Sequence, residues 1–446
     1  MAHIAICTSK LKGLLYASFE LARRLESEGH SITFLCPIDV KNLIENEGFK
    51  FLEVPPIKFW YKPNAVKKNS WKERFKTHFT SRDLGFETLK KELHIPVYIE
   101  TLKKIKPDLV ICDMQLHEII FAAYGLKIPL KLLSPWFCMR KIAGLPSIKS
   151  PIIPIKNSIK STIEIEKYWL KLKAKIYLRY ISDILTFRNY RRSILKKYAK
   201  SVGFNTKHLI LRNFPSHFIY NKLPILTLTL KEMEFPHKNP DNLIYLGLMV
   251  YQNRIDANYP ENDRFRLNQL IEAKIKDNKK LIYCGMGSME KGDLPFLNKL
   301  LEAVGNNSEW ILIVSLGGLL TKNELYTIPD NVQLFNWVSQ PELLKHVDCC
   351  INHAGINTIN ECIINKTPML IYSWHRVDKD GTAARMKYYK IALVREKEND
   401  TPEDIKTAIT TLLTKENMYS QNLEKFYKIQ KEYQAKKLTP VLGINA

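Results

Sequence analysis

Hydrophobic residues near the amino terminus follow two kinds of spacing. Residues 3–8 form a short β-rich run, and residues 31–36 form another. Between them, Ala17, Leu21 and Leu25 recur at helical spacing, and Gly29 ends that pattern. Short continuous runs indicate buried strands, whereas helical spacing indicates an amphipathic helix. The pattern therefore predicts a strand, a helix and a second strand, which is how a doubly wound parallel sheet begins.

The same alternation continues along the chain and then starts again. Further strands of the first sheet are predicted at residues 108–112, 130–134 and 225–230. A second set is predicted at residues 280–285, 310–315, 332–336, 349–352 and 369–372. A chain of 446 residues exceeds what one hydrophobic core usually organises, so two domains are expected. The predicted division is a first domain at 1–245, a linker at 246–266, a second domain at 267–420 and a helix at 421–446 that packs back across both.

Three segments of the first domain fit this alternation poorly. Residues 58–82 mix aromatic and basic side chains with a single acidic residue, Glu73. Residues 142–159 are rich in Pro, Ile and Lys, and residues 163–200 form a long helical pattern with many Tyr and Lys. Such insertions usually carry acceptor or partner specificity. The part from 58 to 79 is either a solvated basic loop or a segment that touches an anionic membrane beside the mouth of a binding site.

The composition is that of an ordinary globular protein, with 45% hydrophobic and 25% charged residues, but the formal net charge is +23. Such an excess attracts nucleic acid, anionic lipid or anionic metabolites, and it also arises from a lysine-rich composition alone. No recognised nucleic-acid module accompanies it, so nucleic acid is not an expected partner. The eight cysteines lie mostly in apolar runs without zinc-like pairing, which indicates reduced core residues. Because no run of about 18 uncharged apolar residues occurs, we expect a cytoplasmic protein, and peripheral contact with the inner membrane surface stays open.

Residues 337–385 carry the densest candidate chemistry. An apolar run at residues 349–352 leads into the turn His353-Ala354-Gly355, and residues 357–365 have helical spacing. A strand that passes through a glycine turn into a helix presents backbone N–H groups and the positive end of a helix dipole, which suit a diphosphate. His353 and Thr358 can add side-chain donors there. Glu361, one turn further, is placed to accept hydrogen bonds from ribose hydroxyls.

The order of residues along this segment resembles that of UDP-dependent glycosyltransferases, which glucosylate or glucuronidate small lipophilic acceptors. The matching residues are Trp337, Gln340, His353, Gly355, Asn357, Thr358, Glu361, Pro368 and Asp378. Gly287 and Ser288 match the family's G-S or G-T turn, and the opening MAHIAIC…LARRLESEGHSITFLCP is similar to the bacterial branch that modifies macrolides and carotenoids. The resemblance implies the GT-B fold, in which two Rossmann-like doubly wound domains face a cleft and a C-terminal helix crosses between them.

The resemblance also implies a role for each matching residue. In the family the tryptophan stacks on uracil, the glutamine lies close to the nucleoside and the glutamate holds the ribose, which points to Trp337, Gln340 and Glu361. The diphosphate and the sugar are held by residues that correspond to Gly287, Ser288, His353, Gly355, Asn357, Thr358, Asp378 and Lys379. The implied donor is a UDP-sugar and the implied acceptor a small molecule. The implied chemistry is inverting transfer without a metal or other cofactor.

Two departures from the family bear on catalysis. Counting back from Leu21-Ala22, the position of the family's catalytic histidine falls on Leu14. Loss of a general base for an alcohol acceptor forfeits about 10²–10⁴-fold in rate. Asp113 matches the aspartate that orients that histidine, and His117, four residues on, could lie near it on the same helical face and replace the base. Lys379 stands where the family has a glutamine, and a cation there suits a charged sugar better than glucose.

Several alternatives remain open from the sequence. The acceptor could be a nitrogen or an already ionised oxygen, or Asp113 could itself act as the base, in which case nitrogen or hydroxyl acceptors are favoured over acids. Asp113 could instead cap the following helix. The chain could also bind a nucleotide sugar as a partner subunit without transferring it. Asp378-Lys379-Asp380 spells the D-x-D motif of metal-dependent glycosyltransferases, but it follows the second phosphate-binding unit, where GT-B enzymes use the helix dipole and side chains.

Overall fold

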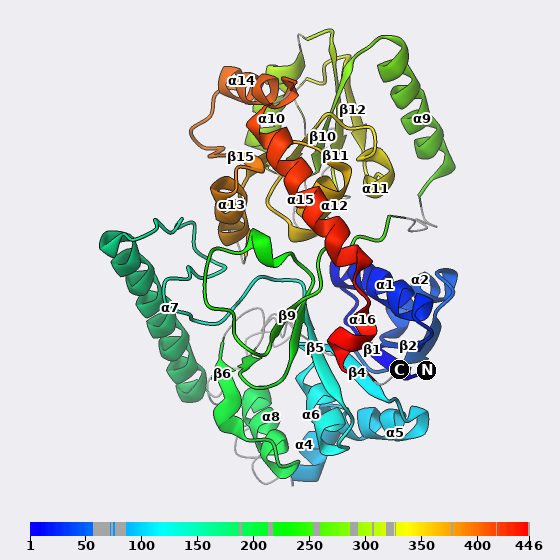
Figure 1. Ribbon diagram of the computed structural model, residues 1–446, viewed down its shortest axis with the longest axis vertical. Helices are drawn as coiled ribbons and strands as arrows, with labels where there is room; N and C mark the ends of the chain where they lie inside the picture. The colour runs from blue at the N-terminus through cyan, green and yellow to red at the C-terminus, as the bar shows by residue number, and fades with distance from the viewer. Residues whose placement is uncertain are drawn as a thin grey trace.

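The chain forms two α/β domains, each built on a parallel sheet (Figure 1). The computed structural model describes residues 1–56, 72, 75, 86–186, 190–212, 217–252, 259–285, 293–305, 307–317, 325, 327–375, 378–415 and 417–444. Most of the segment 58–79, predicted to touch a membrane, lies outside these residues, and so do Gly287 and Ser288. The prediction of two doubly wound sheets is confirmed.

The first sheet has the strand order β3-β2-β1-β4-β5-β8-β9, with every pair parallel. Its strands are β1 (His3–Cys7), β2 (Ser31–Cys36), β3 (Lys50–Glu53), β4 (Leu109–Asp113), β5 (Leu130–Ser134), β8 (Ile225–Thr227) and β9 (Leu243–Tyr245). The helices of this domain are α1 (Lys12–Ser27), α2 (Lys41–Asn46), α4 (Phe86–Glu92), α5 (Ile95–Ile105), α6 (His117–Gly125), α7 (Ile159–Leu185) and α8 (Tyr190–Ser201). A separate antiparallel pair joins β6 (Leu209–Leu211) to β7 (Phe218–Tyr220). The central strands read as continuous apolar runs because helices cover both faces of a parallel sheet.

The second sheet has the order β12-β11-β10-β13-β14-β15, which is the strand order of a dinucleotide-binding fold. Its strands are β10 (Lys280–Gly285), β11 (Trp310–Ser315), β12 (Val332–Phe335), β13 (Cys349–Asn352), β14 (Met369–Tyr372) and β15 (Ala392–Arg395). The helices are α9 (Glu261–Lys276), α10 (Leu294–Gly305), α11 (Gln340–Leu343), α12 (Ile356–Asn365), α13 (Lys379–Tyr388) and α14 (Pro402–Leu413). All eight cysteines are buried and none forms a disulfide bond, as predicted.

Several predicted boundaries differ from the structure. The long helical pattern at 163–200 is two helices, α7 and α8. The helix predicted at 421–446 instead begins behind the N-cap Asn417 and ends at Ala435. Helix α9 begins inside the predicted linker 246–266. Its mostly polar sequence buries only Leu267 and Ile271 and so gives a weak periodic signal. The short strands β3, β9 and β15 were not predicted.

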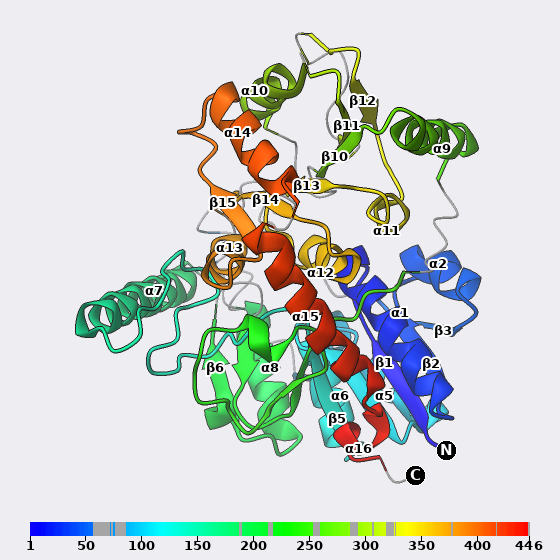
Figure 2. The same cartoon turned by 45° about the horizontal axis from the view of Figure 1, so that its top comes forward.

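The end of the chain crosses from the second domain to the first. Helix α15 (Met418–Ala435) runs between the two domains, and α16 (Leu438–Leu442) packs on the first (Figures 1 and 2). The Gln430 side chain accepts from the backbone N–H of Leu248 and donates to the carbonyl of the same residue, at 2.8 and 3.0 Å. The Glu28 carboxylate accepts from the N–H groups of Leu438 and Thr439, both at 2.7 Å. This arrangement matches the predicted crossing helix.

A buried ion pair joins the two domains directly. Arg385 of α13 lies 2.5 Å from the Glu234 carboxylate, which follows the short 3-10 helix Lys231–Met233 between β8 and β9, and both side chains are 0% exposed. The guanidinium also lies between the rings of Phe137 and Phe235, with centroids at 4.8 and 4.6 Å. Tyr389 donates to the Glu234 carbonyl. These contacts fix α13 of the second domain against the first.

Candidate functional site

The turn that follows β13 leaves the amino terminus of α12 without a capping side chain. Asn352 accepts from the Ala354 N–H at 2.9 Å, and Ala354 adopts a left-handed φ of 65°. Gly355 is the N-cap residue, and no side chain hydrogen-bonds to the helix there. A Cβ at this glycine would lie 3.2 Å from His353 Nε2. The backbone N–H groups of the first turn of α12 therefore suit an anion, as the sequence predicted.

Three of the predicted donor-binding residues form one hydrogen-bonded group beside this terminus. The Gln340 amide donates to the Thr358 hydroxyl at 3.2 Å and to the Glu361 carboxylate. The Tyr283 hydroxyl donates to the Gln340 carbonyl oxygen at 3.0 Å. Tyr283 comes from β10, a strand that the sequence predicted without giving this residue a role. The group holds Glu361 in place near the helix terminus.

A second group surrounds His353. Its ring stacks on Trp374 with centroids 4.7 Å apart, and the Lys379 ammonium lies 4.7 Å from the Trp374 ring on the side of α13. Burial, together with the Lys379 charge, lowers the pKa of His353 to about 3. A hydrogen bond to the Gly285 backbone opposes this lowering, and the imidazole is neutral at pH 7. Asp378, the N-cap of α13, has its pKa raised to about 6 by burial, against the lowering effect of Lys379 and Lys149.

The first domain reaches the site through the start of α1. The Lys12 ammonium lies 5.2 Å from the centroid of the Trp337 ring. The next residue, Gly13, is so close to α12 that a Cβ would lie 2.3 Å from the Asn357 amide nitrogen. Since α1 follows β1 and α12 follows β13, the loops at the carboxyl ends of both sheets meet here. Lys12 and Gly13 were not predicted as site residues, because their partners lie in the other half of the chain.

Leu14 and Asp113 lie on the first-domain side of this junction. Leu14 is 6% exposed and packs in the core of the first domain. Asp113 ends β4, and burial raises its pKa to about 7, against the lowering effects of the Gln115 N–H and the Ser9 hydroxyl. The predicted rise toward neutrality is confirmed. The alternative that Asp113 caps α6 is wrong, because its carboxylate accepts from Gln115 at 3.0 Å and the N-cap, Leu116, makes no side-chain bond.

His117 does not share a helical face with Asp113. The chain changes from strand to helix between them, so the expected spacing of one helical turn does not apply. The His117 ring is 1% exposed, lies 2.6 Å from the Tyr220 hydroxyl and packs against Phe218 with centroids 5.3 Å apart. Burial lowers its pKa well below the usual value. A histidine enclosed in this way has no surface for a substrate, so its prediction as a replacement base is wrong.

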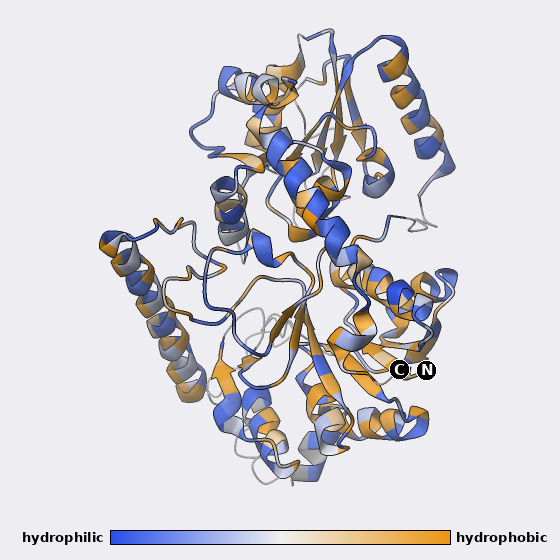
Figure 3. Ribbon diagram, in the orientation of Figure 1, coloured by the Kyte–Doolittle hydropathy of each residue, from blue (hydrophilic) through white to orange (hydrophobic). Residues whose placement is uncertain are grey.

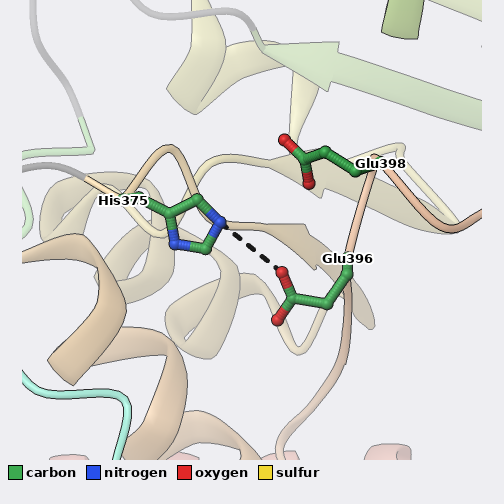
Figure 4. Close-up of side chains that lie close together, drawn as sticks. All are labelled: His375, Glu396 and Glu398. Atoms are coloured by element: carbon green, nitrogen blue, oxygen red, sulfur yellow. Dashed lines mark ion pairs between the residues drawn. The ribbon is translucent and has the colours of Figure 1, made fainter.

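Metal-ligand geometry is found in one place among the described residues, and neither aspartate of the D-x-D motif belongs to it. His375, Glu396 and Glu398 offer ligand atoms within 4.8 Å of one another, and all three are exposed (Figure 4). The Asp380 carboxylate of the motif instead accepts from Ser373 at 2.5 Å and lies 3.0 Å from His375 Nδ1. The two aspartates of the motif therefore do not form the cluster.

None of the described helices is long and apolar enough to cross a bilayer.

Comparison with known proteins finds one family that resembles the second domain. Residues 267–440 match the model of the UDP-glucoronosyl and UDP-glucosyl transferase family. Over these residues, which are less than half of the chain, the protein is similar to this family. The matched region contains all described residues that were predicted to bind the donor.

Individual relatives agree with this similarity. Oleandomycin glycosyltransferase of Streptomyces antibioticus is 30% identical over 26% of this chain and 26% of its own length. Zeaxanthin glucosyltransferase of Pantoea ananas is 21% identical over 88% of this chain and 84% of its own length. The chain spans less than half the length of the first three curated relatives it matches, at 26%, 40% and 45%. The crystal structure of the glycotransferase of kitacinnamycin superposes with a TM-score of 0.65 at 18% identity, over 97% of this chain and 95% of that one. The GT-B fold is thereby confirmed.

Proposed function

We propose that this protein is an inverting glycosyltransferase that moves a sugar from a UDP-sugar, or a related nucleotide sugar, to a small lipophilic acceptor. The observation that carries the proposal is the group formed by Gln340, Thr358 and Glu361 beside the uncapped terminus of α12. A carboxylate held by an amide suits ribose hydroxyls, and a helix terminus suits a diphosphate. The similarity to the family supports the same donor class.

The transfer we propose is a single displacement. The acceptor attacks the anomeric carbon while the bond to the diphosphate oxygen breaks, and the nucleotide leaves with its charge stabilised by the α12 backbone amides. His353 adds a hydrogen bond as a neutral donor, because its pKa of about 3 leaves it uncharged. The positive end of α12 and these donors take the place of a metal ion in this proposal. Lys379 beside the sugar position favours an acidic or otherwise charged sugar.

The proton of the acceptor needs a base other than histidine. In the proposal Asp113 takes it, because a carboxyl with a pKa of about 7 is a stronger base than an exposed aspartate. Asp113 and the loop that carries Lys12 lie at the carboxyl ends of the neighbouring strands β4 and β1. A hydroxyl or amine acceptor can hydrogen-bond to this carboxylate, whereas a carboxylate acceptor would be repelled.

A nucleotide-sugar-binding partner subunit without transferase activity is the second candidate. The observation that favours it is Leu14, a buried leucine at the position of the family's catalytic histidine. Both candidates require donor binding, so binding alone does not separate them. Peripheral contact of residues 58–79 with an anionic membrane also remains a prediction, since most of that segment lies outside the described residues.

A thermal-shift screen of nucleotide sugars tests the donor, since a ligand that binds only the folded state raises stability by RT ln(1 + [L]/Kd). UDP and TDP sugars should be compared, with adenosine diphosphate sugars as the control. A mass-shift assay with the best donor and a panel of lipophilic alcohols and amines then tests transfer. Stabilisation by a donor without any transfer would favour the partner subunit, and no stabilisation by any pyrimidine nucleotide would contradict both candidates.

A further inference from the structure

Helix α7 has two apolar faces, and one of them packs against the first domain. Ile165, Trp169 and Ile176 are buried on that face. The Trp169 indole donates to the carbonyl of Leu145 at 2.8 Å, and the Arg212 guanidinium lies 5.3 Å from the Trp169 ring centroid. These contacts fix the helix in one orientation. The opposite face therefore points away from the domain.

The opposite face carries a continuous stripe of exposed apolar residues. At about 3.6 residues per turn these positions fall on one side of the helix. The outer stripe consists of Ile159 (79% exposed), Ile163 (48%), Leu170 (69%), Tyr177 (57%), Leu178 (67%), Ile181 (50%), Ile184 (41%) and Leu185 (67%). Figures 1 and 2 place α7 at the edge of the molecule, and Figure 3 shows hydrophobic residues recurring along its whole length. Single exposed apolar residues are ordinary, but a stripe of this length marks a contact surface.

Lysines line both edges of the outer stripe. At the same helical spacing, one edge carries the exposed lysines Lys160, Lys167, Lys171 and Lys175. Lys173 lies on the other edge. Glu164 is interspersed among them, and Glu166 is already paired with Lys141. The surface is therefore apolar along its centre and positively charged along its edges.

We propose that the outer stripe docks the protein onto an anionic lipid bilayer. A helix with this pattern lies in the plane of the interface, with apolar side chains below the headgroups and lysines beside the lipid phosphates. An apolar stripe can also bind the same stripe of a second copy of the chain. Because both edges carry lysines, pairing two copies in either orientation would bring like charges together, and each copy carries a net charge of +23. The inference does not depend on the proposed sugar transfer.

Flotation of the full chain with vesicles of equimolar phosphatidylcholine and phosphatidylglycerol tests this docking, with phosphatidylcholine vesicles as the neutral reference. The wild type should float with the anionic vesicles at low salt. Replacing Ile163, Leu170 and Ile181 together by Gln should lower the bound fraction at least about tenfold, since less apolar surface enters the interface. The matched control replaces Ile38, Phe265 and Ile275 by Gln, which are 51%, 65% and 70% exposed on other elements, and should bind like the wild type.

A second variant, in which lysines beside the outer stripe are replaced, keeps the test valid if the variant with Gln in the stripe folds poorly. Lys167→Gln, Lys171→Gln and Lys175→Gln together should weaken anionic binding by about fivefold per lysine and leave binding to neutral vesicles unchanged. Circular dichroism and melting curves check that each variant is folded.

The proposal is overturned if the wild type stays in the soluble fraction at low salt, or if the folded α7 variants float as well as the wild type. Light scattering that finds a wild-type dimer and a monomeric α7 variant, without vesicle binding, would assign the stripe to a second copy instead.

Discussion

Removal of the Arg385 guanidinium is expected to lower the free energy of unfolding by about 3–5 kcal/mol. The substitution Arg385→Met keeps an apolar side chain between Phe137 and Phe235, so little packing is lost. What remains is the Glu234 carboxylate, which is 0% exposed and has lost the cation 2.5 Å away. An uncompensated buried charge is the source of the expected loss.

Two contacts place the expected loss near the lower end of that range. The Glu234 carboxylate also accepts from the backbone N–H groups of Cys138 and Phe235, at 3.1 and 3.0 Å. These hydrogen bonds belong to the first domain and survive the substitution, so we expect about 3 kcal/mol. Because Arg385 and Glu234 belong to different domains, the loss should appear as weaker domain association before either sheet unfolds.

Urea denaturation followed by fluorescence and circular dichroism measures this effect, and small-angle scattering reports separation of the domains. Two probes are needed, since a two-domain chain need not unfold in one step. The control is Lys41→Met, where the lysine and its partner Glu45 are 45% and 48% exposed and the expected cost is about 1 kcal/mol or less. The double variant Arg385→Met/Glu234→Leu should recover most of the stability, because no charge stays buried. If Arg385→Met cost no more than the control, the buried pair would not hold the domains together.

Three further substitutions probe the site itself. Glu361→Ala should weaken donor binding by about 1.5–3 kcal/mol, the cost of lost charge-assisted hydrogen bonds, and unchanged nucleotide affinity in calorimetry would remove the ribose role. The folded pKa of Asp113, about 7, lies above its unfolded value, so its contribution to stability is present at low pH and is lost as pH rises to about 7. Asp113→Asn should abolish that part of the pH dependence of melting and lower turnover about 10²–10⁴-fold, while full turnover with normal donor binding would make Asp113 structural. Lys379→Gln should shift donor preference toward neutral sugars in a competition assay, and an unchanged preference would contradict the proposed charge selection.

The parts of the fold that local pattern controls could be predicted from the sequence. The apolar run at β13, the glycine turn and the helical spacing of α12 lie within one short stretch, and the structure brings Gln340, Thr358 and Glu361 together beside it. The weakly periodic helix α9 and the short strands β3 and β9 gave too little signal. Their structure depends on packing against neighbours that the local sequence does not show.

The wrong prediction for His117 has a physical cause of the same kind. A separation of four residues places two side chains on one face only if the chain between them is helical. Here β4 ends at Asp113 and α6 begins at His117, so helical spacing does not relate the two side chains. The cross-domain partners, Lys12 with Trp337 and Glu234 with Arg385, could not be predicted, because each depends on how the finished domains meet.

The contacts between the two domains differ in how easily they can accommodate an added methyl group. Two glycines, each in the first turn of a helix at these contacts, show the difference. A Cβ at Gly381 in α13 would lie 2.2 Å from the backbone oxygen of Ile148, which cannot move aside alone. A Cβ at Gly13 in α1 would instead meet the end of the Asn357 side chain at 2.3 Å, which can rotate away.

Gly-to-Ala substitution in a helix normally stabilises it by about 1 kcal/mol. At Gly13 that gain should survive, whereas at Gly381 overpacking should reverse it into a loss of about 1–3 kcal/mol and separate the domains in small-angle scattering. Equal stability of the two alanine variants would contradict this reasoning, because it would mean that the contact of α13 with Ile148 accommodates a methyl group as easily as the contact of α1 with Asn357. If they differ as expected, the contact between α1 and α12 is the one that can adapt, because a side chain rather than backbone lies against Gly13 there.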